Sequence, residues 1–283
     1  MPEITLHHRD NLEWLKSQPD DSVDLVFTSP PYESARTYGV GFNLNGQKFV
    51  DWCFSRYIEC LRVCRGLVAW VIEGRTKRFR YTATPALLMA DLHRAGVHLR
   101  KPPAFHRIGI PGSGGPDWLR NDWEWIICAT SGGKLPWSDN TAMGHAPKYG
   151  TGGACSNRNE DGTRRSNGIA TRGSKNGDTK TESFYAKPDI ANPGNVIHAA
   201  VGGGVMGSPL SHENEAPFPQ KLAEFFVRSF CPPGGTVLDI HSGSGTTGAA
   251  ALQCSRNYIG IDFRRSQIDL TRRRLQEVQP ELF

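Results

Sequence analysis

The chain has 283 residues, 38% of them hydrophobic, which is enough for one sizeable core with a smaller appended region. Its net charge of +5 permits an anionic partner without requiring one. The amino terminus lacks the basic-then-apolar pattern of a signal peptide, and no apolar run could span a bilayer, so we expect a cytoplasmic protein with no membrane partner. The seven cysteines have no metal-ligand spacing, which predicts buried thiols in a reducing compartment and no metal site.

Short buried strands alternate with helices along most of the chain. We predict strands at residues 23–28, 67–73, 123–129, 236–241 and 257–263. We predict helices at residues 49–64, 84–95, 217–230, 244–254 and 264–278. Strands separated by helices indicate βαβ units, and therefore an α/β fold with a mostly parallel sheet.

Residues 138–195 interrupt this alternation. They are rich in glycine, asparagine, serine, threonine and arginine, and they hold too little apolar surface for a core of their own. The sequence leaves two interpretations open: a disordered loop, or a segment that becomes ordered on a partner.

A rigid corner follows the strand predicted at 23–28. Its residues are Ser29, Pro30, Pro31 and Tyr32. Two consecutive prolines cannot continue a central strand or enter a helix interior, so the corner stands at the carboxyl end of a buried strand, where open α/β sheets place ligands. It fixes a backbone carbonyl and presents an aromatic ring, which are two features that a flipped-out base needs. Taken alone, the same residues also fit a structural turn with a packed tyrosine.

A glycine-rich turn follows Asp239 in the strand predicted at 236–241. Its residues are His241, Ser242, Gly243, Ser244, Gly245 and Thr246. Glycines here let the backbone approach a ligand without a Cβ clash, and the following helix presents free N–H groups. Asp262 ends the next strand about 20 residues later, where a carboxylate can accept hydrogen bonds from ribose hydroxyls. The unit therefore suits a nucleoside-containing ligand.

The turn also matches the GxGxxG pattern, which keeps a nicotinamide-dependent oxidoreductase as an alternative. Only about 35 residues follow the last glycine, too few for the rest of a dinucleotide fold. Asp239 also precedes the glycines, where a carboxylate could hold the ammonium group of a ligand. The sequence is not a phosphate-binding P-loop, because no Gly-Lys-Ser/Thr follows.

The two motifs together resemble the amino-methyltransferase family of DNA-modifying enzymes. The proline corner comes first and the glycine turn last, an order that resembles the β subgroup of that family. The resemblance implies a Rossmann-like methyltransferase fold, S-adenosylmethionine as cofactor, and DNA as the partner whose flipped-out base receives a methyl group on an exocyclic amine. It divides the chain into a catalytic half at 1–101, a target-recognition region at 102–195 with one core strand near 123–129, and a cofactor half at 196–283.

The resemblance also implies the roles of individual residues. The corner, Ser29 to Tyr32, is catalytic. The implied cofactor-binding residues are Asp10, Asn11, Phe218, Asp239, His241, Ser242, Gly243, Ser244, Gly245, Thr246, Asp262 and Phe263. Of these, Asp10 contacts the adenine amine, Asp262 the ribose, and Asp239 the methionine end. Position 241 is usually phenylalanine in the family and is His241 here.

The residue at position 29 predicts which base is modified. Ser29, with Arg36 and Tyr38 behind it, makes the corner most similar to enzymes that modify N4 of cytosine and take part in restriction-modification. Adenine N6, RNA or a protein amide remain alternative acceptors, and a non-catalytic nucleic-acid-binding protein is a further alternative.

A basic segment suits phosphate binding and so gives separate support for DNA, although the same residues also fit a solvated loop. Its cations, interleaved with aromatic residues, are Arg75, Lys77, Arg78 and Arg80. We expect Arg272, Arg273 and Arg274 to form a solvated helix face, Trp52 to lie in the core, and His198 and His212 to lie in loops.

Overall fold

The computed structural model describes residues 2–33, 42–109, 114–147, 161, 163 and 189–278. The chain divides into two units, Met1–Ala142 with Gly194–Phe283, and Met143–Pro193. In the second unit, His145 and Ala191 form an isolated antiparallel bridge. All the helices and strands below belong to the first unit.

The strands are β1 (Ile4–His8), β2 (Val23–Thr28), β3 (Cys64–Ile72), β4 (Thr76–Lys77), β5 (Arg80–Tyr81), β6 (His98–Leu99), β7 (Ala104–Ile108), β8 (Trp123–Thr130), β9 (Val196–Ala200), β10 (Thr236–Asp239) and β11 (Asn257–Asp262). The α-helices are α1 (Asn11–Lys16), α2 (Gln47–Val63), α3 (Thr84–Arg94), α4 (Gln220–Phe230), α5 (Thr246–Gln253) and α6 (Arg265–Gln276). Two short 3-10 helices, η1 (Gly203–Met206) and η2 (Pro209–Glu213), precede α4.

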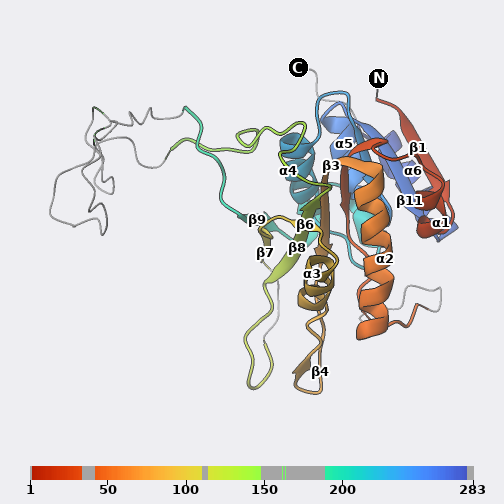
Figure 1. Ribbon diagram of the computed structural model, residues 1–283, viewed down its shortest axis with the longest axis vertical. Coiled ribbons are helices and arrows are strands. Elements are labelled where there is room, and N and C mark those ends of the chain that lie inside the picture. Colours follow the sequence, from red (N-terminus) through yellow and green to blue (C-terminus); the bar gives the residue numbers. More distant parts are fainter. Residues whose placement is uncertain are drawn as a thin grey trace. The chain divides into compact units, whose positions relative to one another are not determined.

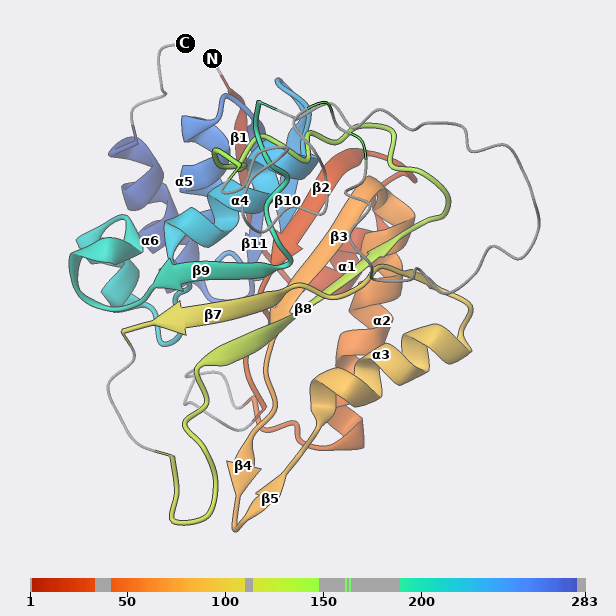
Figure 2. The same ribbon diagram turned by 90° about the vertical axis from the view of Figure 1, so that its left-hand side faces the viewer.

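A mixed sheet forms the centre of the first unit (Figures 1 and 2). In the described part of the chain it has nine strands, ordered β1-β11-β10-β2-β3-β8-β7-β9, with β6 beside β8. The strands from β1 to β3 in this order are parallel. The next strand, β8, runs antiparallel to β3 and to β7, whereas β9 is parallel to β7. The sheet is therefore mostly parallel, as the sequence predicts, with an antiparallel strand that the sequence does not predict.

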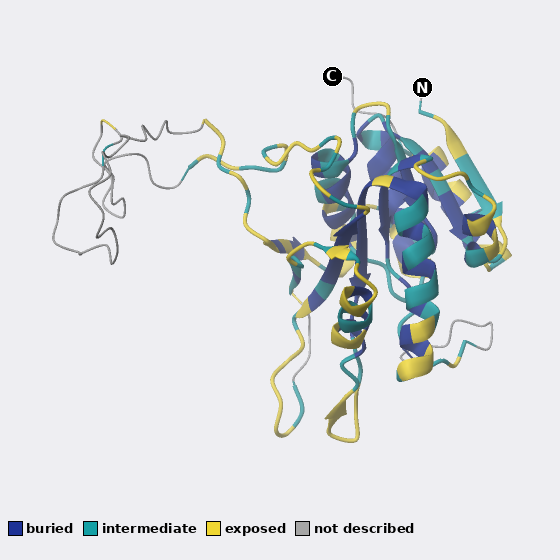
Figure 3. Ribbon diagram, in the orientation of Figure 1, coloured by how far each residue is buried: buried dark blue, intermediate teal, exposed yellow. Residues whose placement is uncertain are grey.

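Helices cover both faces of the sheet, with α2 and α4 on opposite sides of β3 (Figure 1). On β2, Leu25 and Phe27 pack with α4 and α5, whereas Val26 packs with α2 and α3. A strand covered on both faces needs a continuous apolar run, which explains the sequence of β2. The central strands are accordingly the most buried part of the unit (Figure 3).

The predicted strands and helices are confirmed in type, with shifts at their ends. The helix predicted from residue 217 begins at Gln220, because Pro219 has an extended backbone with ψ of 143°. Four strands that belong to the sheet were not predicted, namely β1, β6, β7 and β9.

Two of these strands bear on the predicted division of the chain. The target-recognition region predicted at 102–195 contains strand β7, which lies in the main sheet. Strand β1 lies beside β11, in the half that was assigned to residues 196–283. Most of the polar segment 138–195 falls outside the described residues.

The described cysteines behave as core residues. All six are buried, and burial raises the pKa of Cys64 and of Cys128 to about 12. Within the described ranges, no helix is both long enough and apolar enough to cross a membrane.

Candidate active site

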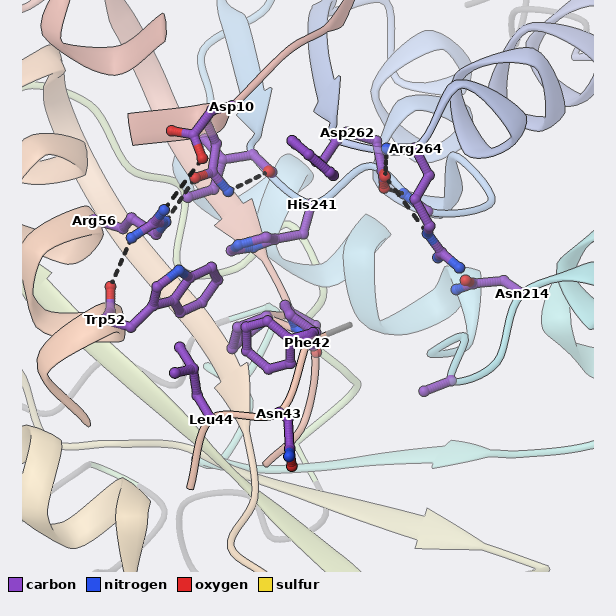
Figure 4. A pocket seen from close by; sticks show the side chains of 18 residues that line it. Asp10, Phe42, Asn43, Leu44, Trp52, Arg56, Asn214, His241, Asp262 and Arg264 are labelled. Atoms are coloured by element: carbon purple, nitrogen blue, oxygen red, sulfur yellow. Dashed lines mark hydrogen bonds and ion pairs between the residues drawn. The ribbon is translucent and has the colours of Figure 1, made fainter. Parts of the chain in front are cut away.

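A cavity of about 380 Å³ lies where β2, β10 and β11 end (Figure 4). These three strands are parallel neighbours, so the segments that follow them emerge at one edge of the sheet. The cavity brings together many of the residues predicted from the two motifs: Asp10, Asn11, Ser29, Pro30, Pro31, His241, Gly243, Asp262 and Phe263. Residues more than 200 positions apart in the sequence thus share one wall.

The carboxylate of Asp262 organises the glycine turn. Its Oδ2 accepts a 3.0 Å hydrogen bond from the Gly243 N–H, and its Oδ1 accepts one of 2.8 Å from the Arg264 N–H. Gly243 has φ of +52°, and a Cβ there would stand 3.0 Å from Nδ2 of Asn214. Burial raises the pKa of Asp262. A carboxylate has about four lone-pair sites, so two remain for the hydroxyls of a ligand.

Asp239 lies behind the cavity wall in a hydrogen-bonded chain. The Thr28 hydroxyl donates to Oδ1 of Asp239 at 2.6 Å, and Nδ1 of His241 lies 3.1 Å from the same hydroxyl oxygen. Because the single hydroxyl proton goes to Asp239, the network assigns the proton of the ring to Nδ1 of His241. Its Nε2 is then an acceptor, buried and without a hydrogen-bond partner among the described residues.

Burial shifts the pKa of both titratable groups in this hydrogen-bonded network, Asp239 and His241. It raises the pKa of the Asp239 carboxyl to about 6, against the opposing effect of its hydrogen bonds. It lowers the pKa of His241 well below its ordinary value. The His241 ring stands between Trp52 and Trp70, with ring centroids 5.6 Å from each. The position that is usually phenylalanine therefore keeps an aromatic environment and gains a buried acceptor.

Contacts with helix α6 hold the rest of the glycine turn in place. The hydroxyls of Ser242 and Thr271 lie 2.7 Å apart, and Gly245, with φ of +76°, leaves no room for a Cβ beside Thr271. Of the predicted residues in this turn, Gly243 lines the cavity. The other four, Ser242, Ser244, Gly245 and Thr246, lie beside it in the same turn and contact α6.

Arg274 also supports the turn, which corrects the expectation that it is solvated. It is 1% exposed, and NH1 donates to Oγ1 of Thr246 at 2.8 Å, while NH2 donates to Oε1 of Gln220 at 3.1 Å. Burial lowers its pKa to about 10. Arg273, by contrast, is exposed and pairs with Glu213.

The proline corner contributes two kinds of residue. Ser29, Pro30 and Pro31 line the cavity, whereas Tyr32 does not. The Tyr32 hydroxyl donates to Oε2 of Glu124 at 2.6 Å, and Oε1 of Glu124 lies 3.0 Å from NH1 of Arg107. The buried Glu124 therefore fixes the direction of the Tyr32 ring at the edge of the site.

Helix α2 adds two residues that sequence reasoning missed. Trp52 packs against the core, as expected, but it also lines the cavity, and the guanidinium of Arg56 lies 4.0 Å from the Trp52 ring centroid. Arg56 Nε donates to Oδ1 of Asn11 at 2.7 Å, and Asn11 Nδ2 donates to the Ile240 carbonyl. A tryptophan and an arginine four positions apart share one helix face, which is the signal that could have revealed them.

Asp10 lies just after β1 and contacts two parts of the protein, the start of α1 and Arg56. Its Oδ1 caps α1 by accepting from the Leu12 N–H at 2.9 Å, and its Oδ2 lies 3.4 Å from NH2 of Arg56. Its side chain remains 38% exposed and lines the cavity, so it can still meet a ligand.

Some predicted residues lie elsewhere. Phe218 packs edge-on against Phe27, with ring centroids 5.4 Å apart, and Ala216 lines the cavity instead. Arg36 and Tyr38 fall outside the described residues. His198 is not in a loop but on β9, where its Nδ1 lies 2.8 Å from Nδ1 of His106. His212 lies in the short helix η2, with Nε2 3.0 Å from the Gly203 carbonyl oxygen.

The fold and this cavity define a Rossmann-like methyltransferase. The chain belongs to the N6/N4 DNA methylase family, whose model matches residues 23–273. The cofactor of this family is S-adenosylmethionine. The chain is therefore a DNA methyltransferase of the class that modifies exocyclic amines.

Individual relatives agree with this assignment over nearly the whole chain. Type II methyltransferase M.ScaI of Streptomyces caespitosus is 25% identical, over 99% of this chain and 84% of its own. DNA adenine methyltransferase YhdJ of Escherichia coli is 24% identical, over 96% of this chain and 82% of its own. Among solved structures, the cytosine-N4-specific PvuII DNA methyltransferase has a TM-score of 0.67 at 19% identity, covering 100% of this chain and 90% of that one.

Proposed function

We propose that this enzyme methylates N4 of cytosine in DNA. The observation that carries the proposal is the position of Ser29, at the head of the proline corner and on the wall of the cavity. A serine hydroxyl is a neutral acceptor and donor, so it can accept from an exocyclic amine or donate to a ring nitrogen. A carboxylate at this position would resemble the adenine enzymes. The structural likeness to a cytosine-N4-specific enzyme agrees with this choice.

The cavity fits S-adenosylmethionine. Asp262 retains lone pairs for the ribose hydroxyls, Asp10 faces the cavity for the adenine amine, and Gly243 lets the backbone approach the ligand. We assign the methionine ammonium to the buried Asp239, in line with the family resemblance. Trp52 and Phe263 add aromatic surface to the same cavity.

The chemistry then depends on how the base is held. An exocyclic amine is a poor nucleophile because its lone pair is delocalised into the ring. Hydrogen bonds from the amine to the Ser29 hydroxyl and the Pro30 carbonyl favour the geometry from which the nitrogen can attack. When bound, S-adenosylmethionine supplies a methyl group already activated by its sulfonium. Catalysis is therefore chiefly positioning and local electrostatics.

Stacking and phosphate contacts complete the proposal. Tyr32, directed by Glu124, would stack on a flipped-out cytosine, because a base inside a duplex cannot reach the cavity. Arg75, Lys77, Arg78 and Arg80 would bind phosphates beside the site.

Transfer of tritium from S-adenosylmethionine to duplex DNA, followed by nucleoside analysis, tests the proposal. We expect labelled N4-methylcytosine. Labelled N6-methyladenine alone would contradict the cytosine assignment and favour the activity for which YhdJ is named. Label in RNA or protein, with none in DNA, would contradict the substrate class as well.

A further inference from the structure

A two-stranded hairpin projects from the edge of the sheet that carries the proline corner. Strands β4 and β5 pair with each other directly after β3, and β3 is the parallel neighbour of β2, which leads into the corner. The hairpin extends beyond the end of β3, on the same side as the loop between β7 and β8 (Figure 2). Any duplex that delivers a base to the cavity must lie against this edge.

The tip of the hairpin presents an aromatic ring to solvent. Phe79 is 70% exposed, and its ring meets the ring of Trp118 edge-on, with centroids 5.5 Å apart. Arg78 and Phe79 have φ of 50° and 63°, in the left-handed region that side-chain-bearing residues rarely adopt. Leu119, next to Trp118, is 92% exposed. Exposed apolar groups gathered at one place are typical of an interaction site.

Hydrogen bonds hold the base of the hairpin firmly. Oε1 of the buried Glu73 accepts from the Tyr81 hydroxyl and from the Gly74 N–H, both at 2.7 Å. Arg75 and Thr82 bond across the hairpin, each backbone N–H donating at 2.9 Å. A Cβ on Gly74 would stand 2.6 Å from the Tyr81 ring, so the close approach needs glycine here. The tip is thus carried on a fixed support.

The charges beside the ring identify the partner. Lys77, Arg78 and Arg80 are exposed and form no ion pair within the described residues. Three uncompensated cations around an aromatic ring suit a partner that offers phosphates and flat apolar faces together. Nucleic acid has both, since phosphates attract the cations and the bases stack on the ring.

We propose that Phe79 is a wedge that enters the base stack of duplex DNA beside the target nucleotide, while Lys77, Arg78 and Arg80 bind the flanking phosphates. The ring would replace stacking lost when the base turns out, so it stabilises the extrahelical state rather than the chemical step. The inference rests on the proposed function only in that DNA is the substrate, and it holds for either target base.

A pair of duplexes tests the wedge. One carries a site that the wild-type enzyme methylates, with the target base normally paired; in the other, an abasic site stands opposite the target base, which is then already unpaired. We expect Phe79→Ala to lower kcat/KM on the paired duplex by about tenfold or more. On the abasic duplex we expect kcat/KM of the same variant to stay within about threefold of wild type, because less stacking has to be broken.

Two controls separate this role from others. Lys77→Ala should weaken binding to both duplexes equally and reduce the salt dependence of binding, as loss of a phosphate contact does. Phe79→Leu, which keeps an apolar wedge, should recover part of the activity on the paired duplex. Wild-type melting temperature and S-adenosylmethionine affinity in Phe79→Ala would show that the protein is intact. Unchanged activity of Phe79→Ala on the paired duplex, or an equal loss on both duplexes, would overturn the wedge; wild-type protein that methylates neither duplex would instead overturn the proposed function.

Discussion

The Thr28 hydroxyl donates a 2.6 Å hydrogen bond to Oδ1 of Asp239, although 211 positions separate the two residues. Thr28 is the last residue of β2 and leads into the proline corner, while Asp239 is the last residue of β10 and leads into the glycine turn. The bond therefore joins the ends of the two neighbouring strands that carry the proposed base site and cofactor site. Both residues are buried, so water cannot replace the bond if it is broken.

Replacing this hydroxyl by a methyl group should destabilise the protein. In Thr28→Val the buried Asp239 carboxylate loses a donor, which we expect to lower the free energy of unfolding by about 1.5–3 kcal/mol at pH 8. Thr130→Val is the matched control, since the Thr130 hydroxyl is buried on β8 and has no partner in the described part of the chain. Urea denaturation of both variants makes the comparison. Equal effects would show that the Thr28–Asp239 bond contributes little.

Cofactor affinity should fall in mild acid because of Asp239. The pKa of Asp239 is raised to about 6, and a bound ammonium group needs the ionised form. Below about pH 6 binding must expel a proton, so affinity should fall about tenfold per pH unit. The stability of the free protein has the opposite sign: the contribution of this group is present below the unfolded pKa of about 4 and is lost as the pH rises through about 6.

Calorimetric titration with S-adenosylmethionine between pH 5 and 8 measures this dependence. Asp239→Asn should bind weakly at every pH and show a flat profile over this range. If wild-type affinity is also flat, Asp239 does not hold the ammonium group.

Two adjacent arginines should respond very differently to substitution. Arg274→Leu leaves several buried acceptors around the glycine turn without their donor, and we expect a loss of about 3 kcal/mol in the free energy of unfolding. Arg273→Leu removes an exposed ion pair and should cost less than about 1 kcal/mol. Thermal unfolding of the two variants checks the contrast. Similar losses would mean that Arg274 does not support the turn as its contacts indicate.

The sequence reveals the strands with a buried apolar run, such as β2, and the turns with a constrained backbone, such as the one at Gly243. It does not reveal β1, which is short and half-exposed and pairs with β11, about 250 residues away. Arg274 was misjudged, and the place of Trp52 on the cavity wall was missed, for a related reason. Local periodicity places a residue on a helix face, but tertiary packing decides whether that face meets the core, a cavity or the underside of a turn.

Removing the Asp262 carboxylate should weaken cofactor binding. Asp262→Ala loses the proposed ribose acceptor and also the bond that holds the Gly243 N–H, so we expect a loss of about 1.5–3 kcal/mol in binding free energy. Asp269→Ala is the control, because Asp269 is half-exposed on α6 and pairs only with arginines on that helix within the described residues. Calorimetry at pH 8 compares the two. Unchanged affinity in Asp262→Ala would refute the ribose assignment.

Ser29 should act on the base and not on the cofactor. Its hydroxyl lies on the cavity wall at the corner, and the proposal gives it a hydrogen bond to the cytosine amine. Ser29→Ala should therefore lower kcat by about tenfold to a thousandfold, as removal of one positioned hydrogen-bonding group does at other active sites. Its S-adenosylmethionine affinity should stay within about twofold of wild type, because the missing bond is made to the other substrate.

Ser29→Thr keeps the hydroxyl and is the conservative control, expected to retain more activity than Ser29→Ala. Single-turnover methyl transfer to duplex DNA, measured beside calorimetric cofactor binding, separates the two effects. A parallel loss of cofactor affinity and of rate in Ser29→Ala would place this hydroxyl in the cofactor site. An unchanged rate would remove it from the mechanism, and with it the main argument for cytosine.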